Sequence, residues 1–152
     1  MDLSSRQGQR LLQIGIALIL YSSIEGFAIP YLGSPRIGLS VHTLSAFQGV
    51  LLLAQGLLWS RLKLSVAAIH AAFWCSIFAT FAILGAYTSA AVWGVGNETI
   101  VLMGELPHGL HHGSVLQETL IKALAYSSAP SGLIAFVLIL RGLRLGGAPA
   151  RG

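Results

Sequence analysis

Residues 64–92 read LSVAAIHAAFWCSIFATFAILGAYTSAAV, and this run contains no Asp, Glu, Lys or Arg. A helix needs about 20 mainly apolar residues to cross a bilayer, and this run is longer than that. Three further apolar runs lie at about residues 11–32, 38–59 and 114–140. Transmembrane β-strands would be about half as long and would alternate in polarity, so the four runs predict transmembrane helices.

The connections between these runs indicate how the helices are arranged. Gly33-Ser34-Pro35-Arg36 has the composition of a turn that breaks a helix, and Ser60-Arg61-Leu62-Lys63 is long enough only for an antiparallel hairpin. The longest connection covers residues 93–113. The sequence therefore predicts an all-α membrane protein in which residues 1–152 form a single domain, an antiparallel bundle of four transmembrane helices.

The composition supports a membrane protein and sets its orientation. Hydrophobic residues make up 55% of the chain and charged residues 9%, whereas a soluble domain has about 25% charged residues. The net charge of +4 is split into short clusters between apolar runs, which is not the pattern of a nucleic-acid-binding surface. Seven of the nine basic residues fall on the side of the two termini, so we expect both termini in the cytoplasm. These seven are Arg6, Arg10, Arg61, Lys63, Arg141, Arg144 and Arg151.

Polar side chains inside the apolar runs are the candidates for a functional site, because burying them in a bilayer is costly. Most of them fall in the non-cytoplasmic half of the predicted bundle, with one near its middle. They are Glu25, His42, Tyr87, Glu118 and Lys122, with Gln48 near the middle. Structural alternatives exist for several: Glu118 and Lys122 are spaced to neutralise each other, Glu25 could pair with Lys122, and Tyr87 could be an interfacial aromatic.

His42 begins a smooth stripe on the second predicted helix. Residues seven apart return to nearly the same side of a helix, so His42, Gly49 and Gly56 share one face, with Ser45 beside it. Such a stripe suits close helix–helix contact, which is the interpretation that the spacing alone favours. It would also suit a flat macrocycle such as haem, with His42 as the axial ligand and Ser45 and Gly49 against the ring.

The histidines of the long connection are weaker candidates for a metal site. His108, His111 and His112 lie in a glycine-containing segment with no cysteine nearby and only Glu105 as a close acid. We expect a solvated loop there and no zinc site. The chain also has no nucleophile elbow, phosphate-binding glycine loop, dinucleotide fingerprint or H-E-x-x-H motif.

Five short blocks of sequence occur in a specific order along the chain. The blocks are residues 34–42 (SPRIGLSVH), 56–62 (GLLWSRL), 92–94 (VWG), 117–122 (QETLIK) and 140–144 (LRGLR). Together they resemble the hydroxylaminobenzene mutase family, small bacterial membrane proteins that isomerise an aryl hydroxylamine to an aminophenol. The resemblance implies an isomerase of the bacterial inner membrane that takes a small apolar aromatic substrate from the bilayer.

A more distant resemblance is to styrene oxide isomerase, a four-helix membrane enzyme that forms homotrimers with haem b between subunits. In that family a histidine early in the second helix binds the iron, an amide follows six residues later, and a tyrosine of the third helix acts at the substrate. His42, Gln48 and Tyr87 match these features. The resemblance thus implies ferric haem b on His42, catalytic roles for Gln48 and Tyr87, and supporting roles for Glu25, Glu118 or Lys122.

The chain departs from the family pattern at three places. Gln48 replaces the usual Asn, Trp59-Ser60-Arg61 replaces Trp-Pro-Arg, and residues 81–84 (FAIL) replace a Tyr-x-Asn-Trp-like stretch. These departures leave three functions open: an aryl hydroxylamine mutase, an epoxide isomerase that forms an aldehyde, and a non-catalytic haem-binding membrane subunit. In either isomerase a ferric iron would act as a Lewis acid without net redox change.

Overall fold

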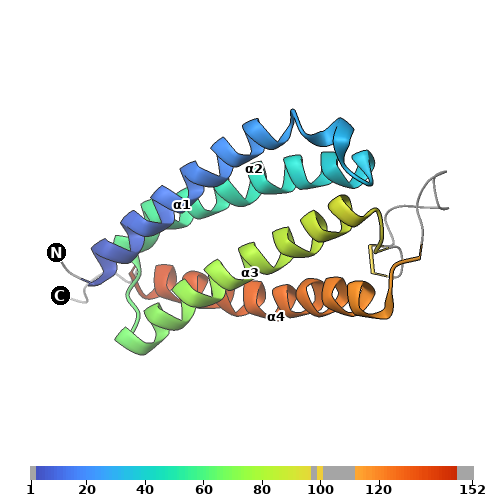
Figure 1. The fold of residues 1–152 in the computed structure, drawn as a ribbon. Helices are drawn as coiled ribbons and strands as arrows, with labels where there is room; N and C mark the ends of the chain where they lie inside the picture. Colours follow the sequence, from blue (N-terminus) through green and yellow to red (C-terminus); the bar gives the residue numbers. More distant parts are fainter. Residues whose placement is uncertain (1–2, 97–98, 101–111, 147–152) are drawn as a thin grey trace, which may run out of the picture.

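The computed structural model of the chain is all-helical and describes residues 3–96, 99–100 and 112–146. Four long helices run antiparallel in sequence order, and two short 3₁₀ helices lie between them (Figure 1). The long helices are α1 (Leu3–Glu25), α2 (Pro35–Leu58), α3 (Val66–Trp93) and α4 (Val115–Gly146), and the short ones are η1 (Ile29–Tyr31) and η2 (Trp59–Arg61). The predicted all-α fold is confirmed for these residues.

Local sequence explains where the two central helices begin and end. The Ser34 side chain accepts a hydrogen bond from the Ile37 amide, and Pro35 occupies the first turn of α2, where its missing N–H costs nothing. Ser65 caps α3 in the same way. Gly94 ends α3 in the left-handed conformation at φ 67°, which glycine adopts without strain.

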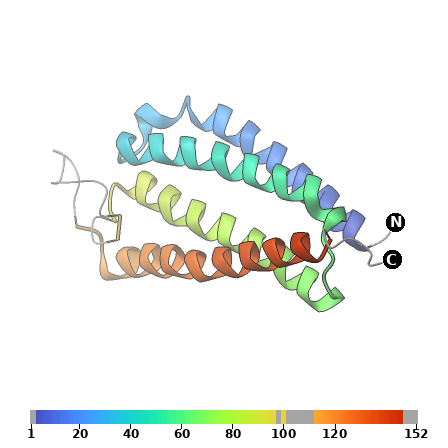
Figure 2. The ribbon, with the colours of Figure 1, turned by 180° about the vertical axis from the view of Figure 1, so that it is seen from behind.

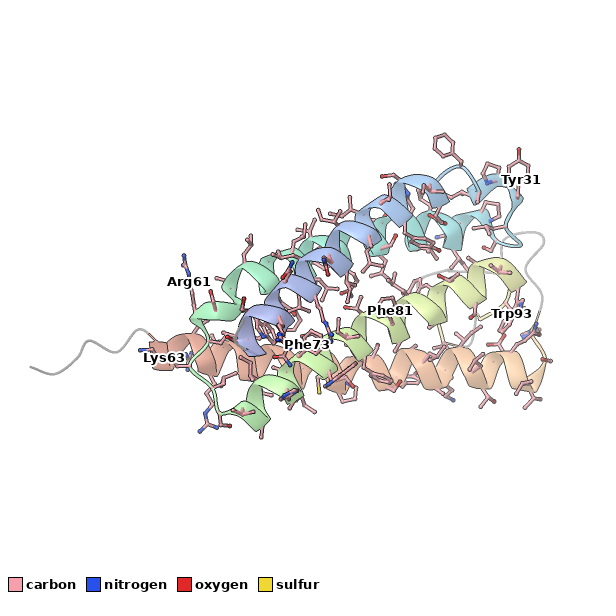
Figure 3. All side chains as sticks on the ribbon, turned by 60° about the vertical axis from the view of Figure 1, so that its left-hand side comes forward. Tyr31, Arg61, Lys63, Phe73, Phe81 and Trp93 are labelled. Atoms are coloured by element: carbon pink, nitrogen blue, oxygen red, sulfur yellow. The ribbon has the colours of Figure 1, made fainter. Side chains whose placement is uncertain are left out.

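The helices form two antiparallel pairs. Figures 1 and 2 show α1 lying along α2 and α4 lying along α3, with α2 and α3 joining the two pairs. The start of α1, the end of α4 and η2 lie at one end of the bundle, which we call the η2 end. Figure 3 shows Arg61 and Lys63 at this end, opposite Tyr31 and Trp93.

The first helix differs from the prediction at both limits. It was expected over residues 11–32, but α1 starts at Leu3 and stops at Glu25. Pro30 explains the earlier stop, because its ring clashes with the carbonyl four residues back and it has no N–H to donate. Within the described part of the chain, three helical stretches are long and apolar enough to cross a membrane, namely Pro35–Arg61, Val66–Trp93 and Val115–Arg144.

Two apolar clusters fill the interior, one toward each end of the bundle. At the η2 end, Trp59 packs edge-on against Phe73 with ring centroids 6.2 Å apart, and Leu11 is completely buried beside them. At the other end, Val41 and Ile121 are buried in a cluster with small residues of α3. Apolar side chains therefore pack the interior of the bundle at both of its ends.

Glycines let α1 and α2 approach each other closely. A Cβ added to Gly49 would lie 2.8 Å from the Gly15 carbonyl oxygen, and one added to Gly15 would lie 2.7 Å from the Gly49 carbonyl oxygen. Gly8 and Gly56 meet in the same way nearer the η2 end, where a Cβ on Gly56 would lie 2.9 Å from the Gly8 oxygen. We call these four residues the glycine seam. They make the close helix–helix contact that the spacing of α2 favoured.

Replacing Gly49 with alanine should therefore destabilise the protein. The added methyl group would push against backbone of α1, and overpacking of this kind costs about 1–3 kcal/mol. Gly85→Ala is the matched control, since its new methyl would meet only Leu124 Cδ1 at 3.5 Å. Unfolding in detergent should show a lower free energy for Gly49→Ala alone. An equal loss in both variants would contradict the seam.

Candidate functional site

His42 is held at the junction of α1 and α2. Its Nδ1 lies 2.9 Å from the backbone oxygen of Ser22, and the Ser22 hydroxyl donates to the His42 carbonyl over 2.8 Å. Gly26 leaves room for the ring, because a Cβ there would lie 3.3 Å from both Cε1 and Nδ1. The imidazole is therefore fixed by backbone groups of α1 and has little freedom to turn.

These contacts determine which ring nitrogen is available. A carbonyl oxygen only accepts hydrogen bonds, so Nδ1 carries the proton and donates it to Ser22. In the neutral ring, Nε2 then has a free lone pair. The His42 side chain is 40% exposed, and among the described residues Nε2 has no hydrogen-bond partner. This is the arrangement of a metal-binding histidine, whose other N–H is fixed by a carbonyl or carboxylate.

His42 is not part of a cluster of metal-ligating side chains in the described parts of the chain. Within the described parts of the chain, no group of three or more His, Cys, Asp or Glu side chains could hold a bare metal ion. Haem supplies four nitrogen ligands and needs only an axial one from the protein. One exposed imidazole nitrogen with its partner nitrogen fixed fits that requirement.

Ser45 and Gly49 face α1. Ser45 is fully buried, and its hydroxyl donates to the backbone oxygens of Val41 and His42. Gly49 lies in the glycine seam. Their role in cofactor binding stays a prediction.

Glu25 is the acidic group nearest to His42. Its Oε2 lies 3.7 Å from His42 Nδ1, and its side chain is only 7% exposed. Neither carboxylate oxygen has a hydrogen-bond partner among the described residues. Lys122 is exposed and forms no ion pair with Glu25 in this part of the chain, so the expected alternative of a Glu25–Lys122 pair is not observed.

Glu118 has a structural role at the start of α4. Its Oε1 accepts hydrogen bonds from the backbone N–H groups of Gly96 and Gly113, at 3.0 and 3.2 Å. The carboxylate thus ties the residues after α3 to the beginning of α4. No ion pair between Glu118 and Lys122 occurs among the residues that the structure describes.

Tyr87 borders a cavity of about 570 Å³ between α2 and α3, which we call the tyrosine cavity. Leu44, Phe47 and Ile83 form apolar walls, and polar atoms come from residues such as Thr43. A mainly apolar pocket with a few polar groups is typical of sites for small organic ligands. The volume and lining suit a single aromatic ring with a polar substituent.

Gln48 lies at a neighbouring cavity of about 390 Å³ between α2, α3 and α4, which we call the deep cavity. Its Oε1 accepts a hydrogen bond from Thr80 Oγ1 over 3.2 Å. Ile83 lines both cavities, so they lie on either side of this side chain. His42 lines neither cavity. One chain therefore brings Gln48 and Tyr87 to adjacent cavities but does not bring His42 to them.

The comparisons with known proteins assign the chain to a family. The family model described as styrene oxide isomerase matches residues 7–144. The chain belongs to the styrene oxide isomerase family. It is 41% identical to hydroxylaminobenzene mutase HabB of Ectopseudomonas oleovorans over 94% of this chain and 84% of that protein. It is 31% identical to hydroxylaminobenzene mutase HabA of the same organism, over 85% and 93% of the two chains. No solved structure matches.

These relationships confirm the predicted resemblance and show that the protein is an isomerase. The alternative of a non-catalytic membrane subunit is therefore not retained. Membership in this family, together with three helical stretches able to cross a bilayer, indicates a membrane isomerase.

Sequence reasoning missed the residues of α1 that hold the isomerase's histidine. Ser22 and Gly26 belong to a helix whose rotation relative to α2 no local pattern specifies. The available signal was the match between the small residues of α1 (Gly8, Gly15) and those of α2, which favours close pairing. Of the three loop histidines, His112 is exposed, while His108 and His111 lie outside the described residues.

His70 is the other histidine within the long helices, and it serves a different network. Its Nδ1 lies 3.3 Å from Gln7 Nε2, and Trp59 Nε1 donates to Gln7 Oε1 over 3.3 Å. This network joins α1, η2 and α3 at the η2 end. His42 contacts the opposite end of α1, so the two histidines do not share a site.

Removing the Ser22 hydroxyl should destabilise the contact between α1 and α2 at His42. Ser22→Ala loses the bond to the His42 carbonyl, and a hydrogen bond between membrane helices contributes about 0.5–1.5 kcal/mol. Ser23→Ala is the control, because the exposed Ser23 hydroxyl donates only to Ile19 of its own helix. We expect reduced unfolding free energy for Ser22→Ala only. If both variants behave alike, the Ser22 hydroxyl does not stabilise the α1–α2 pair.

Proposed function

We propose that the protein converts an aryl hydroxylamine to an aminophenol inside the membrane, with haem b bound through His42. The state of the His42 side chain carries the proposal: its Nδ1 is bound to the Ser22 carbonyl, and the side chain is 40% exposed. The two relatives named hydroxylaminobenzene mutase support the choice of substrate.

His42 is the residue that would hold the cofactor, and Glu25 would support it. When bound, ferric haem supplies a Lewis acid for an oxygen or nitrogen of the substrate. The Nδ1–H group donates to Ser22 and lies 3.7 Å from the Glu25 carboxylate. Partners of this kind orient a ligating histidine and make its free nitrogen more basic. Glu25 therefore acts on His42 as a positioning residue.

The tyrosine cavity would hold the aromatic ring of the substrate. Its walls are mainly apolar, with side chains such as Leu44 and Phe47, and the Tyr87 hydroxyl can donate to or accept from the substrate's polar group. Gln48 borders the adjacent deep cavity, and Thr80 engages its oxygen, so its amide N–H₂ is the group left to orient a substrate oxygen that reaches the boundary between the two cavities. The N–O bond breaks, positive charge spreads into the ring, and the hydroxyl oxygen returns at a ring carbon. That carbon loses its proton and the nitrogen gains one, so there is no net redox change.

The site would be completed by assembly. His42 lines neither cavity of its own chain, and its ring is partly exposed at the surface. We propose a homotrimer in which haem lies between subunits, so that His42 of one subunit and the tyrosine cavity of a neighbour form one site. A cyclic assembly repeats such an unlike contact around a closed ring.

We place the protein in a bacterial inner membrane with four spans and both termini in the cytoplasm. α1 would be the fourth span, since it runs along α2 through the glycine seam. Six of the eight basic residues in the described chain lie toward the η2 end, the exceptions being Arg36 and Lys122, and such an excess is expected of a cytoplasmic side. Arg61 and Lys63 show this placement in Figure 3.

Epoxide isomerisation is the second candidate function, because the matching family model is that of styrene oxide isomerase. The same arrangement would act on an epoxide oxygen, and migration of a hydride would give an aldehyde. The tyrosine cavity is large enough for either substrate. Both substrates are small, apolar aromatic molecules that enter readily from a bilayer, so the choice between them rests on product analysis.

Purified protein should show a Soret absorption band that is lost in His42→Ala, together with conversion of phenylhydroxylamine to aminophenol. His70→Ala is the matched control and should retain both, because His70 is bound to Gln7 at the η2 end. Styrene oxide is assayed in parallel, and formation of phenylacetaldehyde alone would favour the second function. Folded wild-type protein without stoichiometric haem would refute the cofactor proposal.

Replacing Tyr87 with phenylalanine should slow turnover without removing the cofactor. Loss of one hydrogen-bond donor aimed at the reacting group costs about a hundredfold in rate. Tyr126→Phe is the control, because Tyr126 is 62% exposed on α4. The Soret band and the substrate KM separate a catalytic effect from a structural one. Unchanged kcat in Tyr87→Phe would remove Tyr87 from the reaction.

A further inference from the structure

The deep cavity lies between membrane helices, yet several polar side chains line it. Gln55 of α2, Ser76 and Thr80 of α3, and Ser128 of α4 all border it, and each is at least nine-tenths buried. Gln48 completes this polar side of the cavity. Polar side chains from three helices thus converge on one space in the bundle.

Some of these polar groups have partners within the protein and two do not. Thr80 donates to Gln48, and Ser128 donates to the backbone oxygen of Ala125. Among the described residues, Gln55 Oε1 and Ser76 Oγ have no hydrogen-bond partner, although their residues are only 7% and 4% exposed. Burying a polar atom without a partner is unfavourable, so these two atoms indicate a ligand that donates hydrogen bonds.

The rest of the lining indicates the ligand's shape. Leu51, Ile83, Leu133 and Phe136 add apolar side chains to the lining of the cavity. An apolar cavity of about 150 Å³ accommodates benzene, and the deep cavity measures about 390 Å³. We propose that the deep cavity is a binding site for a neutral aromatic molecule that carries an O–H or N–H group, of the phenol or aniline class.

In this site the ligand's O–H or N–H donates to Gln55 Oε1 and its ring packs beside Phe136. Binding in the deep cavity needs neither His42 nor a bound cofactor, so it goes beyond the proposed function. The substrate and product of that function belong to the same chemical class. Since Ile83 separates the two cavities, the deep cavity is a holding site next to the tyrosine cavity.

Fluorine NMR of 4-fluorophenol with the full-length protein in lipid nanodiscs tests this site, with empty nanodiscs as the blank. Gln55→Leu removes the acceptor and keeps the volume of the side chain similar. Gln13→Leu makes the same change on the exposed face of α1 and is the matched control. Gly132→Leu fills the cavity without removing a polar group, since a Cβ there would meet only Ala79 Cβ, at 3.6 Å.

We expect saturable binding of 4-fluorophenol to the wild type, with Kd raised about tenfold in Gln55→Leu, the effect of losing one buried hydrogen bond. Gly132→Leu should weaken binding at least as much, whereas Gln13→Leu and His42→Ala should bind like the wild type. The isostere 4-fluorotoluene, which lacks the O–H donor, should bind more weakly than 4-fluorophenol and should not respond to Gln55→Leu.

Two results would overturn the site: no saturable binding to the wild type, as expected if water alone fills the cavity, or an unchanged Kd in Gln55→Leu and Gly132→Leu. The outcome is separable from that of the proposed function. Retained isomerisation in His42→Ala would refute haem catalysis and leave the deep cavity intact. Loss of 4-fluorophenol binding in His42→Ala would instead show that the two sites are one.

Discussion

The close approach of α1 and α2 is the constraint on which the candidate site depends. Gly15 and Gly49 bring the two backbones so near that a methyl group on either would collide with a carbonyl oxygen. That approach lets the Ser22 carbonyl reach His42 Nδ1 at 2.9 Å. In a bilayer, where hydrophobic burial does not drive helices together, small residues of this kind permit packing contacts and interhelical hydrogen bonds.

Some polar side chains within the helices hold the bundle together, and others are left available to a charge or a ligand. At the η2 end, Gln7 joins Trp59 to His70, and at the other end Glu118 fastens the start of α4. These contacts are made inside the chain, although Glu118 Oε2 has no hydrogen-bond partner among the described residues. In the same part of the chain the Glu25 carboxylate and Gln55 Oε1 also have none despite burial, and Gln55 borders the deep cavity. Since such atoms are costly in a membrane interior, they mark where a charge or a ligand acts.

The sequence was sufficient for the four helices and the turn at Pro35, because apolar length and turn chemistry are local properties. It also singled out His42, since a histidine within an apolar run is costly. It did not reveal that α1 ends at Glu25, where Pro30 outweighs continued apolarity, nor that Lys122 stays unpaired with either acid. Helical periodicity shows which residues share a face, but not which helix meets that face, so Ser22 could not be identified beforehand.

The division of the candidate site over two surfaces follows from the same packing. α2 uses its glycine face against α1, and this leaves the exposed edge of His42 away from the cavities that border α3. A single chain therefore offers a ligand nitrogen on one surface and an aromatic-sized cavity beside Tyr87 on another. A cyclic assembly joins unlike surfaces of neighbouring subunits, so one repeated contact would unite the two halves at every interface. The pairing of α1 with α2 within the subunit and the completion of the site between subunits would then both follow from one feature, the packing of the glycine face of α2 against α1.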